Sequence, residues 1–418
     1  MKKLMSLFCV SLICLLCGCN DDMKVRETIT LTMNEPVFMP ADVFRSSVKV
    51  KTQPEEITQQ GKICFYEGYL YVSEPGRGIH IIDNRNPSSP RATGFIELIG
   101  NADIAIRNNM LYADSYVDLI WFDIANPALP VLKDRLENVF ETLPPVEEGE
   151  IDYQMCFSEE AKTKGVVVGW TKKEKTITYE YYKNEEIYYD MALSNSSGGS
   201  TGVNGSMSRF GLYQDYLYVV LNNQMSIFNL GGAKPEKAAD NMYIGGNVET
   251  IFSYKDCMFM GTPTGMLIYS VADPVNPEYQ SFMSHVYGCD PVVVEDDIAY
   301  VTVHAGNNCG QNFNELIILD VSDVKRPQPI VAYTMTKPKG LGIDNGTLFL
   351  CDDGLKIYNA NDPQTLMANR LAHYSGMEGY DVIPYNNVLM MIAEDGIYQY
   401  DYSDLKEIRL LSKIAVKK

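Results

Sequence analysis

The chain has 418 residues and a formal net charge of −19 at pH 7. Because no basic stripe is available to neutralise phosphates, this acidity argues against nucleic-acid binding. It argues equally against attachment of the folded body to anionic lipid. The hydrophobic fraction of 46% is ample for a core. The length suits two or three average domains, or one domain built from repeats.

The first residues are predicted to be an export signal rather than part of the fold. Lys2 and Lys3 precede an apolar run over 4–16 that is too short to span a bilayer comfortably. The sequence LCGC then resembles the bacterial lipobox, which implies a signal peptide over 1–18 and lipidation, palmitate included, at Cys19. The alternative is an ordinary secretory signal with an accidental cysteine. Asp21 and Asp22 resemble the surface-export signal of Bacteroidetes lipoproteins.

Residues 19–60 are expected to be a lipidated tether with an edge segment, extended around 47–51. The folded domain is expected over 61–418. No CxxC occurs after Cys19, which argues against a thiolate zinc site.

Seven similar units follow, over 61–100, 101–137, 205–246, 247–288, 289–338, 339–376 and 377–416. Each contains short apolar strands separated by turn residues. In the clearest units an apolar strand (GIHIID, DLIWFD or ELIILD) is followed by a polar turn that ends in proline. Aspartate and proline both end strands, because the carboxylate binds nearby backbone N–H groups and proline cannot continue a sheet.

The third strand of each unit is predicted to end at a polar residue: Asp83, Asp123, Asn229, Ser270, Asp320, Asn359 and Asp401. Successive positions lie 40, 106, 41, 50, 39 and 42 residues apart. A period near 40 with four short strands per unit indicates a β-propeller blade. The predicted fold is therefore all-β: a seven-bladed propeller of four-stranded antiparallel blades. The long spacing adds an insertion over about 138–204, between blades two and three.

These units resemble the LVIVD repeat of exported bacterial β-propellers. Three units depart from it, since Asn229 and Asn359 replace the aspartate and the last unit lacks the prolines. The resemblance implies a propeller fold and a lipoprotein of Bacteroidetes type at the outer membrane. It brings no catalytic motif.

Both length anomalies are expected on one face of the propeller, where first strands begin and second strands end. They are the insertion and a ten-residue excess near 304–314. Loops that depart from a repeat on one face mark the expected binding face. Within the insertion, 165–170 and 176–182 are predicted to form a hairpin. Its tyrosines would either offer rings to a sugar or peptide or pack the hairpin on the propeller; they are Tyr179, Tyr181, Tyr182, Tyr188 and Tyr189.

Charged residues at the starts of first strands are expected to ring the channel mouth: Asp103, Arg209, Glu249, Asp290 and Asp381. Converging carboxylates could hold Ca²⁺ through oxygen ligands. The alternative, which we favour, is a water-filled funnel partly neutralised by Arg209, with no cofactor.

Two cysteines of unit five, Cys289 and Cys309, are candidates for a disulfide that would pin the long loop. None of the four histidines has a Ser or Cys nearby in a recognisable catalytic frame. The sequence therefore favours a non-enzymatic surface lipoprotein that binds a protein or glycan partner and touches the membrane only through its lipid. The alternatives are a carbohydrate-active enzyme that uses the channel-mouth carboxylates, and a structural accessory of an outer-membrane assembly.

Overall fold

The computed structural model describes residues 24–182, 209–221, 223–284, 291–304 and 313–417. The regular secondary structure of this part of the chain is mainly β-strand, as predicted, and most strands belong to antiparallel sheets of four. Cys19, Asp290, Cys289, Cys309, Tyr188 and Tyr189 lie outside the described residues, and so do the side chains of Tyr179, Tyr181 and Tyr182.

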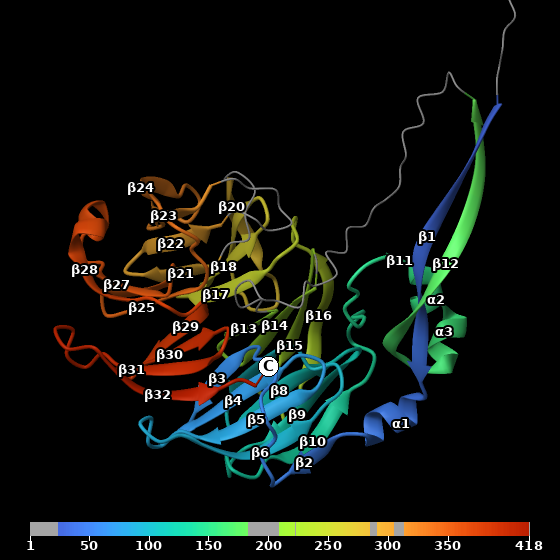
Figure 1. Cartoon of the computed structure of the whole chain (residues 1–418), viewed down its shortest axis with the longest axis horizontal. Coiled ribbons are helices and arrows are strands. Elements are labelled where there is room, and N and C mark those ends of the chain that lie inside the picture. Colours follow the sequence, from blue (N-terminus) through green and yellow to red (C-terminus); the bar gives the residue numbers. More distant parts are fainter. Residues whose placement is uncertain (1–23, 183–208, 222, 285–290, 305–312, 418) are drawn as a thin grey trace, which may run out of the picture.

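Seven sheets, numbered here 1 to 7 in chain order, follow one another through the described residues (Figure 1). Sheet 1 contains β3 (Ile63–Tyr66), β4 (Tyr69–Glu74), β5 (Gly78–Asp83) and β6 (Arg91–Glu97), and β2 (Lys49–Lys51) pairs with β6 as a fifth, outer strand. Sheet 2 contains β7 (Ile104–Arg107), β8 (Met110–Ser115), β9 (Asp118–Asp123) and β10 (Val131–Leu136). Sheet 3 contains β13 (Phe210–Tyr213), β14 (Tyr216–Leu221), β15 (Gln224–Asn229) and β16 (Glu236–Tyr243).

The remaining four sheets repeat the same up-and-down order. Sheet 4 contains β17 (Thr250–Tyr254), β18 (Cys257–Thr262), β19 (Gly265–Ser270) and β20 (Glu278–Ser284). Sheet 5 contains β21 (Val292–Glu295), β22 (Ile298–Val303), β23 (Glu315–Asp320) and β24 (Gln328–Thr334). Sheet 6 contains β25 (Leu341–Asp344), β26 (Thr347–Cys351), β27 (Leu355–Asn359) and β28 (Arg370–Tyr374), with the 3₁₀ helix η1 (Pro363–Asn369) before β28. Sheet 7 contains β29 (Gly379–Tyr385), β30 (Val388–Ala393), β31 (Gly396–Asp401) and β32 (Arg409–Ala415).

Every third strand ends at the polar residue predicted from the sequence, and the contacts explain why. The side chain of that residue accepts a hydrogen bond from the backbone N–H two positions later in all seven sheets. In sheet 5, for example, Asp320 Oδ1 lies 2.9 Å from the Ser322 nitrogen. Asparagine and serine can make the same turn. The departures at Asn229, Ser270 and Asn359 therefore preserve the turn.

The same turn also joins neighbouring sheets. The backbone carbonyl four residues after the end of the third strand accepts a hydroxyl hydrogen bond from the preceding sheet. Five such bonds are Tyr71 to Pro127, Tyr218 to Pro274, Ser281 to Val324, Tyr333 to Pro363, and Ser412 to Pro87. The last of these joins sheet 7 to sheet 1.

The core is divided into apolar clusters that lie between neighbouring sheets. Six clusters join sheets 1 and 2, 2 and 3, 3 and 4, 4 and 5, 5 and 6, and 6 and 7. A seventh brings Ile63 and Val72 of sheet 1 against Met390 and Ile392 of sheet 7. Lys417 near the chain end also donates its backbone N–H to the Ile57 carbonyl at 2.8 Å. The last sheet therefore packs on the first.

The insertion differs from its prediction. Residues 165–170 and 176–182 do not form a hairpin, because Val166–Tyr182 is one continuous strand, β12. Its antiparallel partner is the N-terminal strand β1 (Lys24–Met39), with Lys24 opposite Tyr182 and Met39 opposite Val166. The intervening sequence TKKEK has none of the Gly, Asn, Asp or Pro residues that a tight turn needs. The strand therefore continues and takes a distant partner.

Three short helices and a short strand accompany this pair: α1 (Ala41–Ser46), β11 (Glu150–Ile151), α2 (Tyr153–Phe157) and α3 (Glu159–Lys164). Strand β11 pairs in parallel with β1. Asp152 and Ser158 cap α2 and α3 by accepting backbone N–H groups. In Figure 1 the β1–β12 pair projects away from the seven sheets.

Candidate functional site

One structurally equivalent position lies at or near the start of the first strand of each sheet. The pairings Ile63 with Val72, Ile104 with Ala113 and Phe210 with Val219 align sheets 1 to 3, and the other four sheets align in the same way. The residues just before these pairs are Lys62, Asp103, Arg209, Glu249, Pro291, Gly340 and Asp381. Four described members of the predicted ring thus share one structural position, and Lys62 is a member that the sequence analysis missed.

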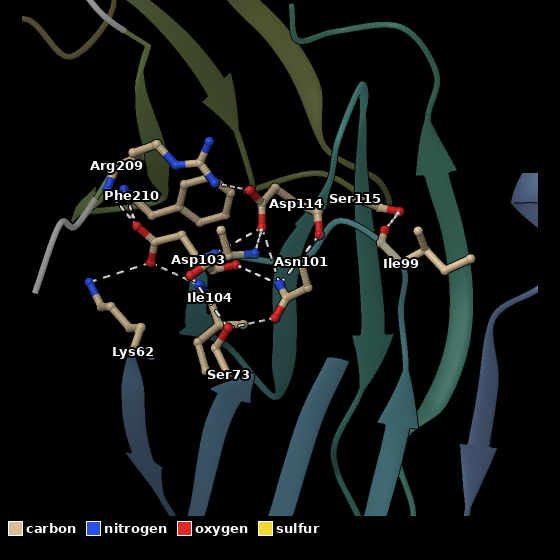
Figure 2. Close-up of polar contacts among 11 residues, drawn as sticks. Lys62, Ser73, Ile99, Asn101, Asp103, Ile104, Asp114, Ser115, Arg209 and Phe210 are labelled. Carbon is tan, nitrogen blue, oxygen red and sulfur yellow. Dashed lines mark hydrogen bonds and ion pairs between the residues drawn. The ribbon is translucent and has the colours of Figure 1, made fainter. Parts of the chain in front are cut away.

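Asp103 is fully buried, and both of its carboxylate oxygens are hydrogen-bonded (Figure 2). Oδ1 accepts the Ile104 N–H at 2.8 Å and lies 3.6 Å from the Lys62 Nζ. Oδ2 accepts the backbone N–H groups of Arg209 and Phe210, the latter at 3.2 Å. One carboxylate therefore joins the starts of the first strands of sheets 1, 2 and 3.

A second buried carboxylate, Asp114 at the end of β8, completes this cluster. Its Oδ1 accepts the backbone N–H groups of Ala102 at 2.7 Å and Asp103 at 2.9 Å, and the Asn101 amide at 3.1 Å. Its Oδ2 receives the Arg209 guanidinium. We call Lys62, Asn101, Asp103, Asp114 and Arg209 the charged cluster.

The electrostatics of the charged cluster follow from its burial. Burial raises the pKa of Asp103, and the nearby cations Lys62 and Arg209 oppose that rise. Burial alone would lower the pKa of Lys62, but Asp103, together with Cys64 and Asp381, outweighs it and raises the pKa above its ordinary value. The lysine is therefore held as a cation beside the Asp103 carboxylate, and the cluster is an ion-pair network that ties three sheets together.

Among the residues that the structure describes, no group of three or more His, Cys, Asp or Glu side chains is placed to hold a metal ion. Glu249 and Asp381 occupy the equivalent positions in sheets 4 and 7. His304, one of the four histidines without a catalytic frame in the sequence, is buried, with 2% of its surface exposed. The described cysteines Cys64, Cys156, Cys257 and Cys351 are free thiols.

The N-terminal segment and the insertion pack together on the same end of sheet 2. Phe44 of α1 is buried against Tyr116 and Val166, and the Phe44 and Tyr116 rings are 6.4 Å apart. Tyr116 belongs to the β8–β9 turn, at the end of the sheet where Asp103 also lies. Val139, which begins the insertion, donates its N–H to Val117 of that turn at 2.8 Å.

A buried ion pair fastens this contact. The Asp118 side chain is fully buried and accepts Arg45 Nε at 2.9 Å, Arg135 Nη1 at 3.0 Å and the Asn138 backbone N–H at 2.9 Å. Arg135 also donates to the Arg45 carbonyl at 2.9 Å. One aspartate of β9 thus holds α1, β10 and the start of the insertion in one place.

These features define an all-β protein of repeated four-stranded antiparallel sheets, with one end elaborated by non-repeat segments. Two stretches, residues 60–95 and 100–137, match the LVIVD repeat, and they coincide with sheets 1 and 2. No curated protein matches the sequence. Among the described residues, no helix is long and apolar enough to cross a membrane.

The solved structures that match the chain have little sequence identity to it. The computationally designed protein Ika8 has a TM-score of 0.50 at 8% identity, and the match covers 88% of this chain and 90% of Ika8. Hsv2p of Kluyveromyces lactis has a TM-score of 0.47 at 10% identity, over 86% of this chain and 99% of that one. A functionally unknown protein from Desulfotomaculum acetoxidans has a TM-score of 0.42 at 8% identity, over 50% and 69% of the two chains.

Proposed function

We propose that the seven sheets are the blades of a closed seven-bladed β-propeller. Two observations support closure. The apolar cluster between sheets 7 and 1 corresponds to the six clusters between the other neighbours. The Ser412 bond to Pro87 uses the same acceptor position as four other bonds between successive sheets. A closed ring leaves no sheet with an uncovered face, which suits a repeat whose strands are buried on both sides.

We propose further that the protein is a surface lipoprotein of Bacteroidetes type, anchored in the outer membrane through Cys19. Its role would be to bind a protein or glycan through the face that carries the non-repeat segments. The observation that carries this proposal is the joint packing of the N-terminal segment and the insertion on that end of sheet 2. Segments that depart from a repeat on one face commonly form its binding surface.

The carbohydrate-active alternative is not favoured by the geometry of Asp103. A catalytic acid or base must reach the glycosidic oxygen or a water molecule. The Asp103 carboxylate is fully buried and is already bonded to backbone N–H groups and to Lys62. We therefore propose binding without turnover, with the charged cluster as the support of the binding face.

The binding role can be tested in two ways, by pull-down from cells that grow together with the source organism and by a glycan array. A variant that lacks 141–204 should lose the partner that the full chain retains, while circular dichroism still reports a folded β-protein. The control is Arg326→Ala. Arg326 is an exposed residue in the turn between β23 and β24, at the end of sheet 5 opposite to the proposed binding face. Retained binding by the deletion variant would show that the site lies elsewhere, and cleavage of a bound glycan would favour the enzyme.

A further inference from the structure

The β1–β12 pair, which we call the ribbon, is long for a two-stranded element. Its strands are paired from Lys24 with Tyr182 to Met39 with Val166, with one irregularity between Val37 and Phe38. At about 3.3 Å per residue, 16 residues of β1 extend roughly 50 Å. In Figure 1 the ribbon stands beside the sheets, and its outer end lies beyond them.

The base of the ribbon is braced by the insertion. The Trp170 indole N–H donates to the Pro144 carbonyl at 2.9 Å, and the Asn34 amide donates to the Glu148 carbonyl at 2.9 Å. Strand β11 pairs with Met33 and Asn34. With the buried Phe44 and the Arg45–Asp118 pair at its foot, the ribbon is fixed in direction relative to sheet 2.

The outer half of the ribbon is held by its own cross-strand contacts. Thr28 lies opposite Thr178 and Thr30 opposite Thr176, and the hydroxyls of the first pair are 3.0 Å apart. Ile29 is opposite Ile177 on the other face. Such cross-strand pairs stabilise a sheet. Two paired strands also resist bending far better than a single chain.

The direction of the chain in the ribbon places the N-terminal residues at its outer end. Strand β1 begins at the outer end, so Cys19 precedes the ribbon by only the residues 20–23. We propose that the ribbon is a rigid spacer between a lipid bilayer and the seven sheets. It would place its foot, where Phe44 packs on sheet 2, about 50 Å from the surface in which the lipid of Cys19 is inserted. This inference rests on the proposed lipidation of Cys19.

The dimensions distinguish a spacer from a flexible tether. Sixteen flexible residues would have an end-to-end distance of only about 20–24 Å, and that distance would fluctuate. The electrostatics also fit, because the chain carries a net charge of −19 and an anionic membrane surface repels it. That repulsion decays over a Debye length of about 8 Å at physiological salt, so about 50 Å removes it.

The test shortens the ribbon but keeps every remaining side chain on its own face. Removing residues 28–31 together with 175–178 deletes four complete pairs, and an even number keeps the alternation of side chains. Neutron reflectometry on a supported bilayer that carries the lipidated protein then measures the height of the sheets. We expect the height to fall by about 13 Å. A matched control removes eight residues from the Gly/Ser stretch 194–205 and leaves the height unchanged.

A second variant covers the case in which the shortened ribbon does not fold. This variant duplicates residues 28–31 and 175–178, which adds four pairs to the ribbon and should raise the sheets by about 13 Å. A second anchor tests the spacer independently of lipidation. A hexahistidine tag replaces the signal peptide and binds a nickel-chelating lipid. Absence of lipid on Cys19 by mass spectrometry would overturn the anchor. An unchanged height on the nickel bilayer, with ribbon residues removed or added, would overturn the spacer.

Discussion

Buried carboxylates at the sheet ends of this protein act as hydrogen-bond acceptors for the backbone. Asp103, Asp114 and Asp118 each accept at least one backbone N–H and each contact an arginine or lysine. Removing one partner of such a buried pair leaves the other charge without compensation, which typically costs about 3–5 kcal/mol. A carboxylate that looks like a channel-mouth ligand in the sequence is thus structural when its neighbours supply donors.

The pair of Glu74 and His80 makes stability depend on pH. Both side chains are buried, and Glu74 Oε2 lies 2.6 Å from His80 Nε2, while Arg77, Glu55 and the Phe95 ring also face this pair. Burial lowers the pKa of His80 below its ordinary 6.5, although Glu74 opposes the shift. Burial would raise the pKa of Glu74, but its bonds to Thr58, His80 and Arg77 lower it overall.

Both shifts have the same sign for stability. Below pH 6.5 the unfolded state binds a proton at His80 more readily than the folded state, so stability falls as pH falls. Glu74 adds to the loss below pH 4.5. Urea unfolding at pH 7.5 and about 5.5 should show a smaller difference for His80→Gln than for the wild type. The exposed His373→Gln is the control, and an undiminished difference in His80→Gln would contradict the assignment.

At the scale of elements, the sequence predicts what is local and misses what is distant. The ends of all third strands follow from one polar residue and its turn, and each lies where the chain itself indicates. The partner of β12 does not follow from the sequence. Along the chain, the strands of sheets 1 and 2 lie between β1 and β12. Lys62 could have been found by counting back from ICFY as Asp103 is found before IAIR. Asp114 carries no such signal, since only the fold brings β8 to Arg209.

The junction of α3 and β12 depends on a glycine. Gly165 has φ of +118°, and a Cβ there would lie 2.0 Å from the Met39 carbonyl oxygen. Gly165→Ala should therefore destabilise the ribbon base by about 1–3 kcal/mol. Gly169→Ala, four residues later within β12, is the matched control because a Cβ there meets nothing within 4 Å. Hydrogen exchange of β12 amides measures the effect, and equal protection in the two variants would refute it.

At the scale of the whole molecule, the contact between sheets 7 and 1 decides whether the repeats form a ring. Asn84 and Gln399 exchange two amide hydrogen bonds, of 2.9 and 2.8 Å, and both side chains are buried. The sequence separation of 315 residues makes this one of the longest-range contacts in the protein. Asn84 lies in the polar turn after GIHIID and Gln399 lies in β31, and nothing in the sequence pairs these two positions.

Breaking this contact tests closure. Gln399→Ala should lower the free energy of unfolding by about 2 kcal/mol, because the Asn84 amide would be left buried without a partner. A double-mutant cycle with Asn84→Ala should give a coupling of about 0.5–3 kcal/mol by urea denaturation. The exposed Gln328→Ala should change stability by less than about 0.5 kcal/mol. Additive losses at Asn84 and Gln399 would mean that sheets 7 and 1 do not meet in solution.

The ribbon also fixes an order of assembly during synthesis. Thr28 and Thr178 are 150 residues apart, so β1 leaves the ribosome long before β12 exists. Sheets 1 and 2, whose strands pair with near neighbours, are complete before that partner appears. Until then β1 is an unpaired strand, and its charges and Pro36 disfavour self-association. Strand β12 can therefore pair with β1 only after every strand of sheets 1 and 2 has been synthesised.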